Sequence, residues 1–404
     1  MMAGGSDAVE MISLTGNPEQ IGATWGRING AALTEQCAGF LRIAAERGLS
    51  RDELLRRAGR GVRIIETVAP HWREEADACA AAAGIDPDEH LAYHVGKYRD
   101  LLSIGEECTS YAAAGSATAG GGAVFHKSRD NVARPQVAYV KRPRVPGVFA
   151  QLTLADTSDL GCMMMLNERG LAGSADTGAE DPHPSGRGLM NPWGLRQIAE
   201  RASSCAEALA IVREWTERGW YAGGRRATNW LFADADGNLL RAVNFSDRVE
   251  VQEARDGMLQ SCERVGLREF LAQRSGALDA AAFMAAARLP GVCFDSTISA
   301  LTVAIDAADP AHGIAWVCVG RPGRLPFVPL GLGAERMPLA LLDGSLSRPP
   351  TEPGLPAEQV AALEADFRAR AAATDPADRA AVEALTSECV RSALAAPQGP
   401  GPTR

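Results

Sequence analysis

The stretch that decides the fold is residues 105 to 131, which reads GEECTSYAAAGSATAGGGAVFHKSRDN. Two runs with strand composition flank the glycine triplet Gly120–Gly122, and glycine enters the left-handed region of a turn without steric cost. We therefore expect a strand, a turn and a second strand that ends in polar side chains. The predicted hairpin returns three charged residues to the neighbourhood of Cys108: Lys127, Arg129 and Asp130.

A cysteine beside cations and a carboxylate is a chemically useful arrangement. The thiolate is the nucleophilic form of cysteine, and neighbouring positive charge lowers the thiol pKa from about 8.5. The alternative is that Cys108 only fills the core, since free cysteine is among the most buried residue types.

The two halves of this hairpin resemble the start of the mature chain in one enzyme family. Cys108-Thr109-Ser110 followed by Lys127-Ser128-Arg129-Asp130-Asn131 is similar to the acyl-CoA:6-aminopenicillanate (isopenicillin N) acyltransferase family. That family is related to bile salt hydrolases and penicillin V acylases, within the N-terminal nucleophile hydrolases. Its members cut themselves just before a cysteine. The resemblance thus implies cleavage between Glu107 and Cys108, and an α+β fold with four layers, αββα, built on two antiparallel sheets and preceded by a helical pro-segment.

The resemblance also implies roles for individual residues. Cys108 would be the nucleophile and its freed α-amine the base, because an α-amine titrates at about 7.7–8.0. Asp130 would orient that amine, and Lys127 or Arg129 could hold the Asp130 carboxylate and the substrate. Three further residues are candidates for the oxyanion hole or for substrate contacts: Asn167 in an Asn-Glu-x-Gly-Leu turn, Asn229 before an Asp-Gly hairpin, and Cys262, which aligns with a family asparagine.

The composition of the whole chain limits the classes of function that it can have. The chain has 404 residues, 46% of them hydrophobic and 23% charged, with a net charge of −9, which is ordinary for a globular protein and argues against nucleic-acid and anionic-membrane partners. No apolar run is long enough to span a membrane. The first ten residues lack the pattern of a signal peptide. The nine cysteines form no zinc-binding spacing, and their odd number favours free thiols in a reducing, cytoplasmic compartment.

The chain divides into three regions by composition. Residues 1–107 have helical periodicity and form the predicted pro-segment, residues 108–345 have strand-rich texture and form the predicted catalytic domain, and residues 346–404 combine a Pro-rich linker with two Ala-rich amphipathic helices. We expect those last helices to serve as an extension that could form a homodimer. His90 and His94 share a helix face, but the sequence between them lacks a metalloprotease glutamate, so we expect no metal site.

Three functions compete. The first is a self-processing cysteine amidohydrolase or acyltransferase that acts on the amide or thioester bond of a small acylated molecule, with no cofactor and with acyl-CoA as a conceivable co-substrate. The second is a catalytically degenerate relative that binds a small ligand or a partner, suggested by the departures from the family pattern at Asn244, Cys262 and Glu263. The third, a papain-like protease, requires a Cys–His pair, for which only His126 is close in sequence.

Overall fold

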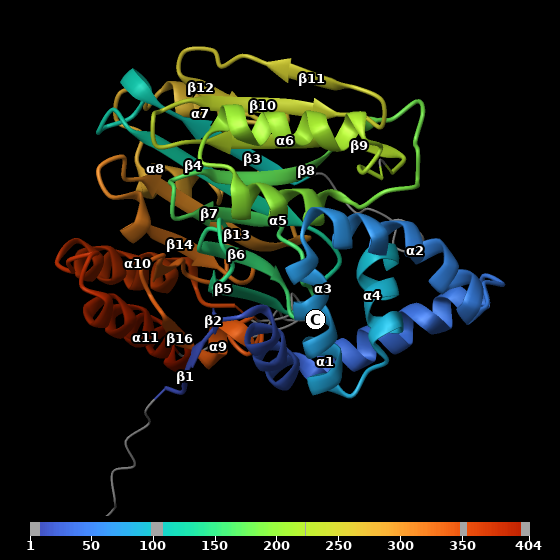
Figure 1. Cartoon of the computed structure of the whole chain (residues 1–404). Coiled ribbons are helices and arrows are strands. Elements are labelled where there is room, and N and C mark those ends of the chain that lie inside the picture. Colours follow the sequence, from blue (N-terminus) through green and yellow to red (C-terminus); the bar gives the residue numbers. More distant parts are fainter. Residues whose placement is uncertain (1–8, 98–107, 223, 348–353, 397–404) are drawn as a thin grey trace, which may run out of the picture.

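A computed structural model of the chain describes residues 9–97, 108–222, 224–347 and 354–396 (Figure 1). Two large β-sheets lie face to face, and helices cover the outer face of each, so the predicted four-layer α+β sandwich is confirmed.

The first sheet has six strands in the order β12-β3-β4-β13-β14-β15, and all of its pairings are antiparallel. The hairpin predicted from residues 105–131 forms its centre, with the turn at the glycine triplet. The strands of this six-stranded sheet are Thr109–Ala113 (β3), Ala123–Asp130 (β4), Met258–Gln260 (β12), Thr297–Ile305 (β13), Ile314–Cys318 (β14) and Val328–Gly331 (β15).

The second sheet has eight strands in the order β11-β10-β9-β8-β7-β6-β5-β2. Its pairings are antiparallel except the one between β2 and β5, which is parallel. Its strands are Thr15–Gly16 (β2), Gln136–Pro143 (β5), Gln151–Asp156 (β6), Met164–Asn167 (β7), Ala172–Glu180 (β8), Arg226–Ala233 (β9), Leu239–Asn244 (β10) and Val249–Gln252 (β11).

The outer layers consist of helices that the apolar periodicity largely anticipates. Helices α5 (Asn191–Arg201) and α6 (Cys205–Glu217) pack on the eight-stranded sheet. Four helices belong to the other side of the sandwich: α7 (Leu267–Ala272), α8 (Ala280–Ala286), α10 (Ala357–Ala372) and α11 (Arg379–Ala395). The two C-terminal helices turn their apolar faces into the core beside β15, where Phe367 and Cys389 are buried. They therefore complete the fourth layer; the predicted homodimer through them stays a prediction.

The N-terminal region is helical, as predicted, and packs against one edge of the sandwich (Figure 1). It contains α1 (Pro18–Glu46), α2 (Arg51–Val68), α3 (Pro70–Ala83) and α4 (Pro87–Gly96). Helix α1 starts at a capping box in which the Asn17 and Gln20 side chains each accept from the other's backbone N–H, at 2.8 and 3.0 Å.

Two short strands tie the N-terminal region to the rest. Besides β2, which extends the large sheet, β1 (Met11–Ser13) pairs with β16 (Arg336–Pro338), just before the short helix α9 (Leu339–Leu342). A network of buried charges joins α3 to the sandwich as well. Glu75 of α3 receives Lys141 of β5 at 2.8 Å and Arg196 of α5 at 2.5 Å.

Two local predictions are wrong. The many Pro and Gly residues of 176–193 predict a polar loop, but the backbone continues as strand β8 as far as Glu180, because Thr177 and its neighbours pair with β9. The strands β15 and β16 were not anticipated, since they are only four and three residues long and lie in a Pro-rich stretch. Within the described ranges, no helix is long and apolar enough to cross a membrane.

Candidate active site

Cys108 directly precedes β3, on a central strand pair of the sandwich. Its Sγ lies 3.9 Å from the backbone oxygen of Asp130, the last residue of β4. Burial raises the pKa of the Cys108 thiol, and the nearby Lys127 ammonium opposes this rise. The predicted hairpin therefore does bring Cys108 to the end of β4, and in the intact chain the cysteine is held as a thiol.

Lys127 lies between the two sheets and makes a buried ion pair. Its Nζ donates to Asp176 Oδ1 at 2.6 Å and to the Ala175 carbonyl at 2.7 Å, both on β8. The side chains of Lys127 and Asp176 are 1% and 0% exposed. Asp176 Oδ2 is buried and has no hydrogen-bond partner among the residues that the structure describes. An ion pair in such surroundings is held only by good geometry, since removing either charge leaves the other buried and uncompensated.

Asp176 is the site residue that sequence reasoning missed. It was placed in a polar loop, whereas it is the fifth residue of β8 and pairs with Asn229 of β9. The resemblance implied that Lys127 could hold Asp130, but the lysine finds its carboxylate on the opposite sheet. A signal was present in the sequence: alternation from Ala172 to Thr177 is compatible with a strand that has one polar face.

Asp130 is buried at the start of a contact between β4 and β13. Its Oδ1 accepts a hydrogen bond from Thr297 Oγ1 at 2.5 Å, and Thr297 Oγ1 in turn accepts from the Phe294 N–H at 2.9 Å. With its backbone oxygen beside the Cys108 thiol, Asp130 lies where a group that orients the cysteine would be needed.

Arg129 faces a different set of partners from Lys127. Its guanidinium donates to both oxygens of Asp156, at 2.6 and 3.2 Å, and to Gln136 Oε1 at 2.9 Å. Together with Arg134 it holds the pKa of Asp156 far below the ordinary range of a carboxyl. This fork-to-fork pairing between β4 and β6 binds the two sheets together, and it occupies the guanidinium that the resemblance offered to the substrate.

The three oxyanion candidates lie in very different places. Asn167 is fully buried in the β7–β8 turn. Its Nδ2 donates to the carbonyls of Ala199 and Ala202 at 3.0 and 2.7 Å, and its Oδ1 accepts from two backbone N–H groups of the turn. Since both amide protons are used, Asn167 secures the turn to the end of α5 and is not brought to Cys108.

Asn229 and Cys262 lie closer to the site. Asn229 pairs with Asp176 in the ladder, and its Nδ2 donates to the Ser261 carbonyl at 3.2 Å and to the Thr177 carbonyl at 3.4 Å. Cys262 follows Ser261, whose backbone N–H donates to the Ser110 carbonyl just beyond the end of β12. The Cys262 Sγ lies 3.5 Å from the Cys108 carbonyl oxygen. Of the three candidates, Cys262 is thus the one placed directly against Cys108, although its thiol is a weak donor.

His126 points away from this cluster. Its ring nitrogens contact Thr302 Oγ1 at 2.7 Å and Ser128 Oγ at 3.0 Å, and its ring stacks on Tyr111. Burial lowers the pKa of His126 to about 3. A papain-like Cys–His pair is therefore not formed between Cys108 and His126. Glu107, the predicted residue before the cut, lies outside the described residues.

In the described ranges, no cluster of three or more candidate metal ligands occurs. The two neighbouring histidines, His90 and His94, contact each other through Nε2 at 3.0 Å, and burial lowers the pKa of His90 to about 4.

Comparisons with known proteins give likenesses of fold. No family model and no curated protein matches the sequence. Among solved structures, an N-acylethanolamine-hydrolyzing acid amidase ortholog from Caenorhabditis elegans is 11% identical, with 49% of this chain and 92% of that chain covered and a TM-score of 0.37. A penicillin V acylase from Agrobacterium tumefaciens is 12% identical, with coverages of 56% and 86% and a TM-score of 0.38. A variant of the conjugated bile acid hydrolase from Clostridium perfringens is 10% identical, with coverages of 56% and 93% and a TM-score of 0.40.

These neighbours belong to the N-terminal nucleophile hydrolases, the superfamily that the sequence resembles. Their identities and TM-scores are low, so the fold and the site described above rest on this chain's own strands and side chains.

Proposed function

We propose that the chain is a self-processing cysteine amidohydrolase or acyltransferase that forms an acyl-enzyme on Cys108. The observation that carries the proposal is the position of Cys108, at the start of a central strand, with the backbone oxygen of Asp130 and the charge of the Lys127–Asp176 pair beside its thiol. The sequence resemblance to the isopenicillin N acyltransferase family supports the same chemistry.

Self-cleavage comes first in the proposed sequence of steps. The Cys108 sulfur attacks the Glu107 carbonyl, and the amide bond is exchanged for a thioester while the thiol proton passes to the departing nitrogen. Water then hydrolyses the thioester, which frees the carboxyl group of Glu107, the thiol and the α-amine of Cys108. The desolvated thiol of the intact chain is consistent with a precursor whose base has not yet been released.

Turnover then uses the new amine. The α-amine takes the proton of the thiol, the thiolate attacks the substrate carbonyl, and the proton passes to the departing amine or thiol. Water or an acceptor amine resolves the acyl-enzyme. A nucleophile next to Lys127 is favoured in its thiolate form, since an ammonium stabilises the negative sulfur, whereas Asp176 disfavours it. Cys262, beside the Cys108 carbonyl, is the nearest of the oxyanion candidates.

The test compares intact masses and turnover in three proteins: wild type, Cys108→Ala and Cys293→Ala, the last a matched cysteine in the segment before β13. Wild type and Cys293→Ala should each give a chain that starts at Cys108 together with a separate fragment of the first 107 residues. Both should cleave the amide bond of an N-acyl amino acid or a β-lactam, or the thioester bond of an acyl-CoA, in a panel of these compounds. Cys108→Ala should stay intact and inactive. Wild-type protein whose sole N-terminus is Met1 or Met2 would refute the amine-base mechanism.

The competing function is a ligand-binding protein with the same fold. It is favoured by one observation, that the group placed against the Cys108 carbonyl is the thiol of Cys262, which is a weak hydrogen-bond donor. An intact wild-type chain that binds an acylated ligand as tightly as Cys108→Ala does, without any turnover, would establish this alternative.

A further inference from the structure

A hollow lies on the surface where the N-terminal helices meet the sandwich. It has a volume of about 320 Å³, and we call it the α2 hollow. Helix α2 forms one wall, and the turn between α6 and β9 forms the other. Half of the described side chains that line it are arginines, and none of them is acidic; they are Arg60, Arg63, Ile64, Thr67, Arg218 and Trp220.

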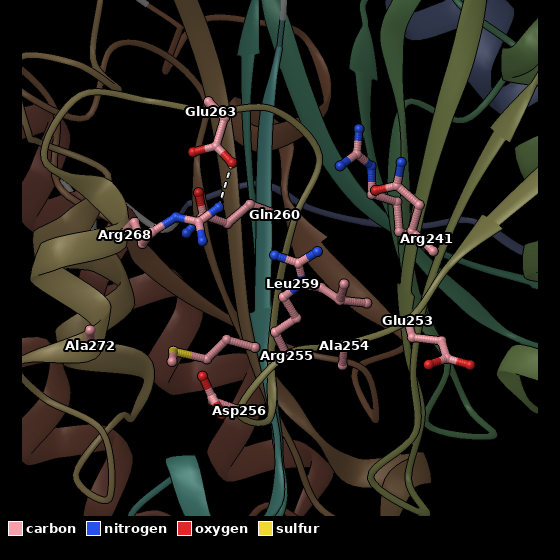
Figure 2. Close-up of a pocket in the computed structure, with 12 residues that line it drawn as sticks. Arg241, Glu253, Ala254, Arg255, Asp256, Leu259, Gln260, Glu263, Arg268 and Ala272 are labelled. Atoms are coloured by element: carbon pink, nitrogen blue, oxygen red, sulfur yellow. Dashed lines mark hydrogen bonds and ion pairs between the residues drawn. The ribbon is translucent and has the colours of Figure 1, made fainter.

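The charge of the α2 hollow differs from that of the larger cavity in the sandwich. That cavity, of about 800 Å³, lies among β10, β11, β12 and α7 (Figure 2). Its lining balances three arginines with three acidic side chains, and Arg268 and Glu263 form an ion pair there. The α2 hollow has three cations without such counter-charges, in a chain whose net charge is −9. A local group of cations of this kind attracts an anion from solution.

The α2 wall follows from helical spacing. Its four lining residues are spaced i, i+3, i+4 and i+7, so they share one face of the helix. Gly61 allows the helix to approach its neighbours closely, since a Cβ there would lie 2.4 Å from Val95 Cγ1 and 3.1 Å from Leu189 Cδ2. This close contact fixes α2, and with it the two arginines Arg60 and Arg63, against the residue that precedes α5.

The other wall is a closed turn at the end of α6. The Gly219 N–H donates to the Thr216 carbonyl at 3.0 Å, and the Trp220 N–H donates to the Trp215 carbonyl at 2.8 Å. These are the two hydrogen bonds of a Schellman motif, in which Gly219 has a φ of 61°. The Arg218 guanidinium lies over the Trp220 ring, 4.9 Å from its centre. The turn therefore presents its cation in a defined position.

The three arginines have few partners within the protein. Arg60 links the two walls, since its Nη2 donates to the Gly219 carbonyl at 3.1 Å. Arg218 pairs with Glu214 at 2.8 Å, and these side chains are 59% and 43% exposed. The Arg63 guanidinium makes no hydrogen bond or ion pair with the residues that the structure describes. Because each guanidinium carries five N–H donors, most of the donors in the α2 hollow remain available to a ligand.

These donors match phosphate better than carboxylate. A phosphate group presents three acceptor oxygens and a charge of about −1.5 to −2, whereas a carboxylate presents two oxygens and a single charge. Guanidinium groups bind phosphate oxygens in pairs. Two joined phosphates offer enough oxygens and charge for all three arginines. The volume also suits a small anion, since sites for small molecules begin at about 300 Å³.

We propose that the α2 hollow binds the diphosphate group of a small soluble molecule, which thereby ties α2 to the turn after α6. Arg60 and Arg63 precede Cys108 in the chain, and Arg218 follows it. The proposed cut before Cys108 would place the two walls on separate chains, and the bound anion would hold these chains together. This role across the cut rests on the proposed function, whereas the binding site itself does not.

Binding is tested on the full-length Cys108→Ala protein, in which both walls belong to one chain. The probe is pyrophosphate, titrated by calorimetry, with acetate for comparison. Pyrophosphate should bind at least about tenfold more tightly than acetate, and its affinity should fall as the salt concentration rises, because salt screens exposed charges. Adding Arg63→Gln or Arg218→Gln should weaken pyrophosphate binding by about tenfold. Arg63→Lys should weaken it less, because lysine keeps the charge and loses the planar fork.

Arg255→Gln is the matched control, since Arg255 lines the charge-balanced cavity of Figure 2. It should leave the affinity for pyrophosphate within about twofold. Absence of pyrophosphate binding, equal affinity for acetate, or full affinity in Arg63→Gln and Arg218→Gln variants that keep the urea midpoint of their parent would overturn the inference. Sedimentation with phosphatidic acid vesicles separates a lipid headgroup from a soluble ligand, and vesicle binding that pyrophosphate does not displace would also overturn it.

The role across the cut is tested on cleaved wild-type protein by size-exclusion chromatography in increasing urea. Pyrophosphate should raise the urea concentration at which the first 107 residues separate from the larger chain, because a ligand stabilises the state that binds it. Arg63→Gln should abolish this shift, and a wild-type protein that binds pyrophosphate without any shift would contradict the role. If wild type binds pyrophosphate but remains a single chain, the proposed function fails together with the role across the cut, and the binding site stands.

Discussion

The buried charges that join α3 to the sandwich can be tested by removing the arginine at their centre. Arg196, 1% exposed, lies between Glu75 and Glu200, with nitrogen–oxygen distances of 2.5 and 2.9 Å. The Arg196→Met variant replaces its stem with a side chain of similar length and removes the charge. Two buried carboxylates then lose their strongest partner.

The size of the loss in unfolding free energy depends on the partners that Glu75 and Glu200 keep in the variant. Lys141 still contacts Glu75 at 2.8 Å, while Glu200 keeps His71 and the Trp72 N–H, both at 2.8 Å. Breaking one buried pair typically destabilises a protein by about 3–5 kcal/mol. The surviving partners keep the expected loss of unfolding free energy within that range at pH 7, although two carboxylates are affected.

The loss should depend on pH in a defined direction. In the wild type, Arg196 and His71 hold the pKa of Glu200 at about 2, below its ordinary value of about 4.5. A carboxyl with a lowered folded-state pKa contributes stability that is full above its unfolded pKa and disappears as the pH falls toward 2. Without Arg196, burial raises the pKa of Glu200, so the folded carboxyl takes up a proton more readily as the pH falls from 7 to 5. We therefore expect the penalty of the variant to be smaller at pH 5 than at pH 7.

The assay is urea unfolding followed by tryptophan fluorescence, at pH 7 and pH 5. Arg56→Met is the control, because Arg56 is an exposed arginine whose partner Glu53 lies three residues away on α2. Its urea midpoint should equal that of the wild type, since exposed ion pairs contribute little to stability. A loss below about 1 kcal/mol for Arg196→Met at pH 7, or an equal loss at both pH values, would refute the reasoning.

Three further predictions concern the site. Lys127→Met leaves Asp176 buried without its cation. We therefore expect the variant to lose its activity and about 3–5 kcal/mol of unfolding free energy, measured by urea unfolding. An unchanged urea midpoint would contradict the stabilising role of this ion pair. Cys262→Ala should lower kcat by about tenfold or less while self-cleavage persists, because a thiol is a weak donor; a complete loss of turnover in the folded, cleaved variant would show that Cys262 does more than donate weakly. His126 has a folded-state pKa of about 3, below its unfolded value of about 6.5. The unfolded chain therefore takes up this proton first, and wild-type stability should fall as the pH decreases from 6.5 toward 4. His126→Gln should flatten this pH dependence of the urea midpoint, and identical slopes in both proteins would count against the prediction.

The sequence predicts the fold well where local signals agree with burial. The glycine triplet and the strand composition around it place β3 and β4 correctly, and the Asp-Gly turn at residues 236–237 places the β9–β10 hairpin. Apolar periodicity likewise finds the C-terminal helices within a few residues. These features depend on neighbours in sequence, which a single chain displays directly.

The candidate site is predicted less completely, because its partners come from distant strands. The sequence suggests Lys127 as a partner for Asp130, three residues away. Because side chains along β4 point alternately to its two faces, Lys127 instead points toward the opposite sheet and pairs with Asp176 of β8.

The pairing of β1 with β16 can form only late in biosynthesis. Met11 lies opposite Pro338, so these partners are separated by 338 − 11 = 327 residues. At about 5–20 residues per second, a ribosome that has made the first strand needs on the order of tens of seconds to supply its partner. During that interval β1 has no ladder to join, although β2 can already pair with β5 and Glu75 of α3 can already pair with Lys141 and Arg196. The N-terminal strand therefore gains its ladder partner only after residue 338 has been made.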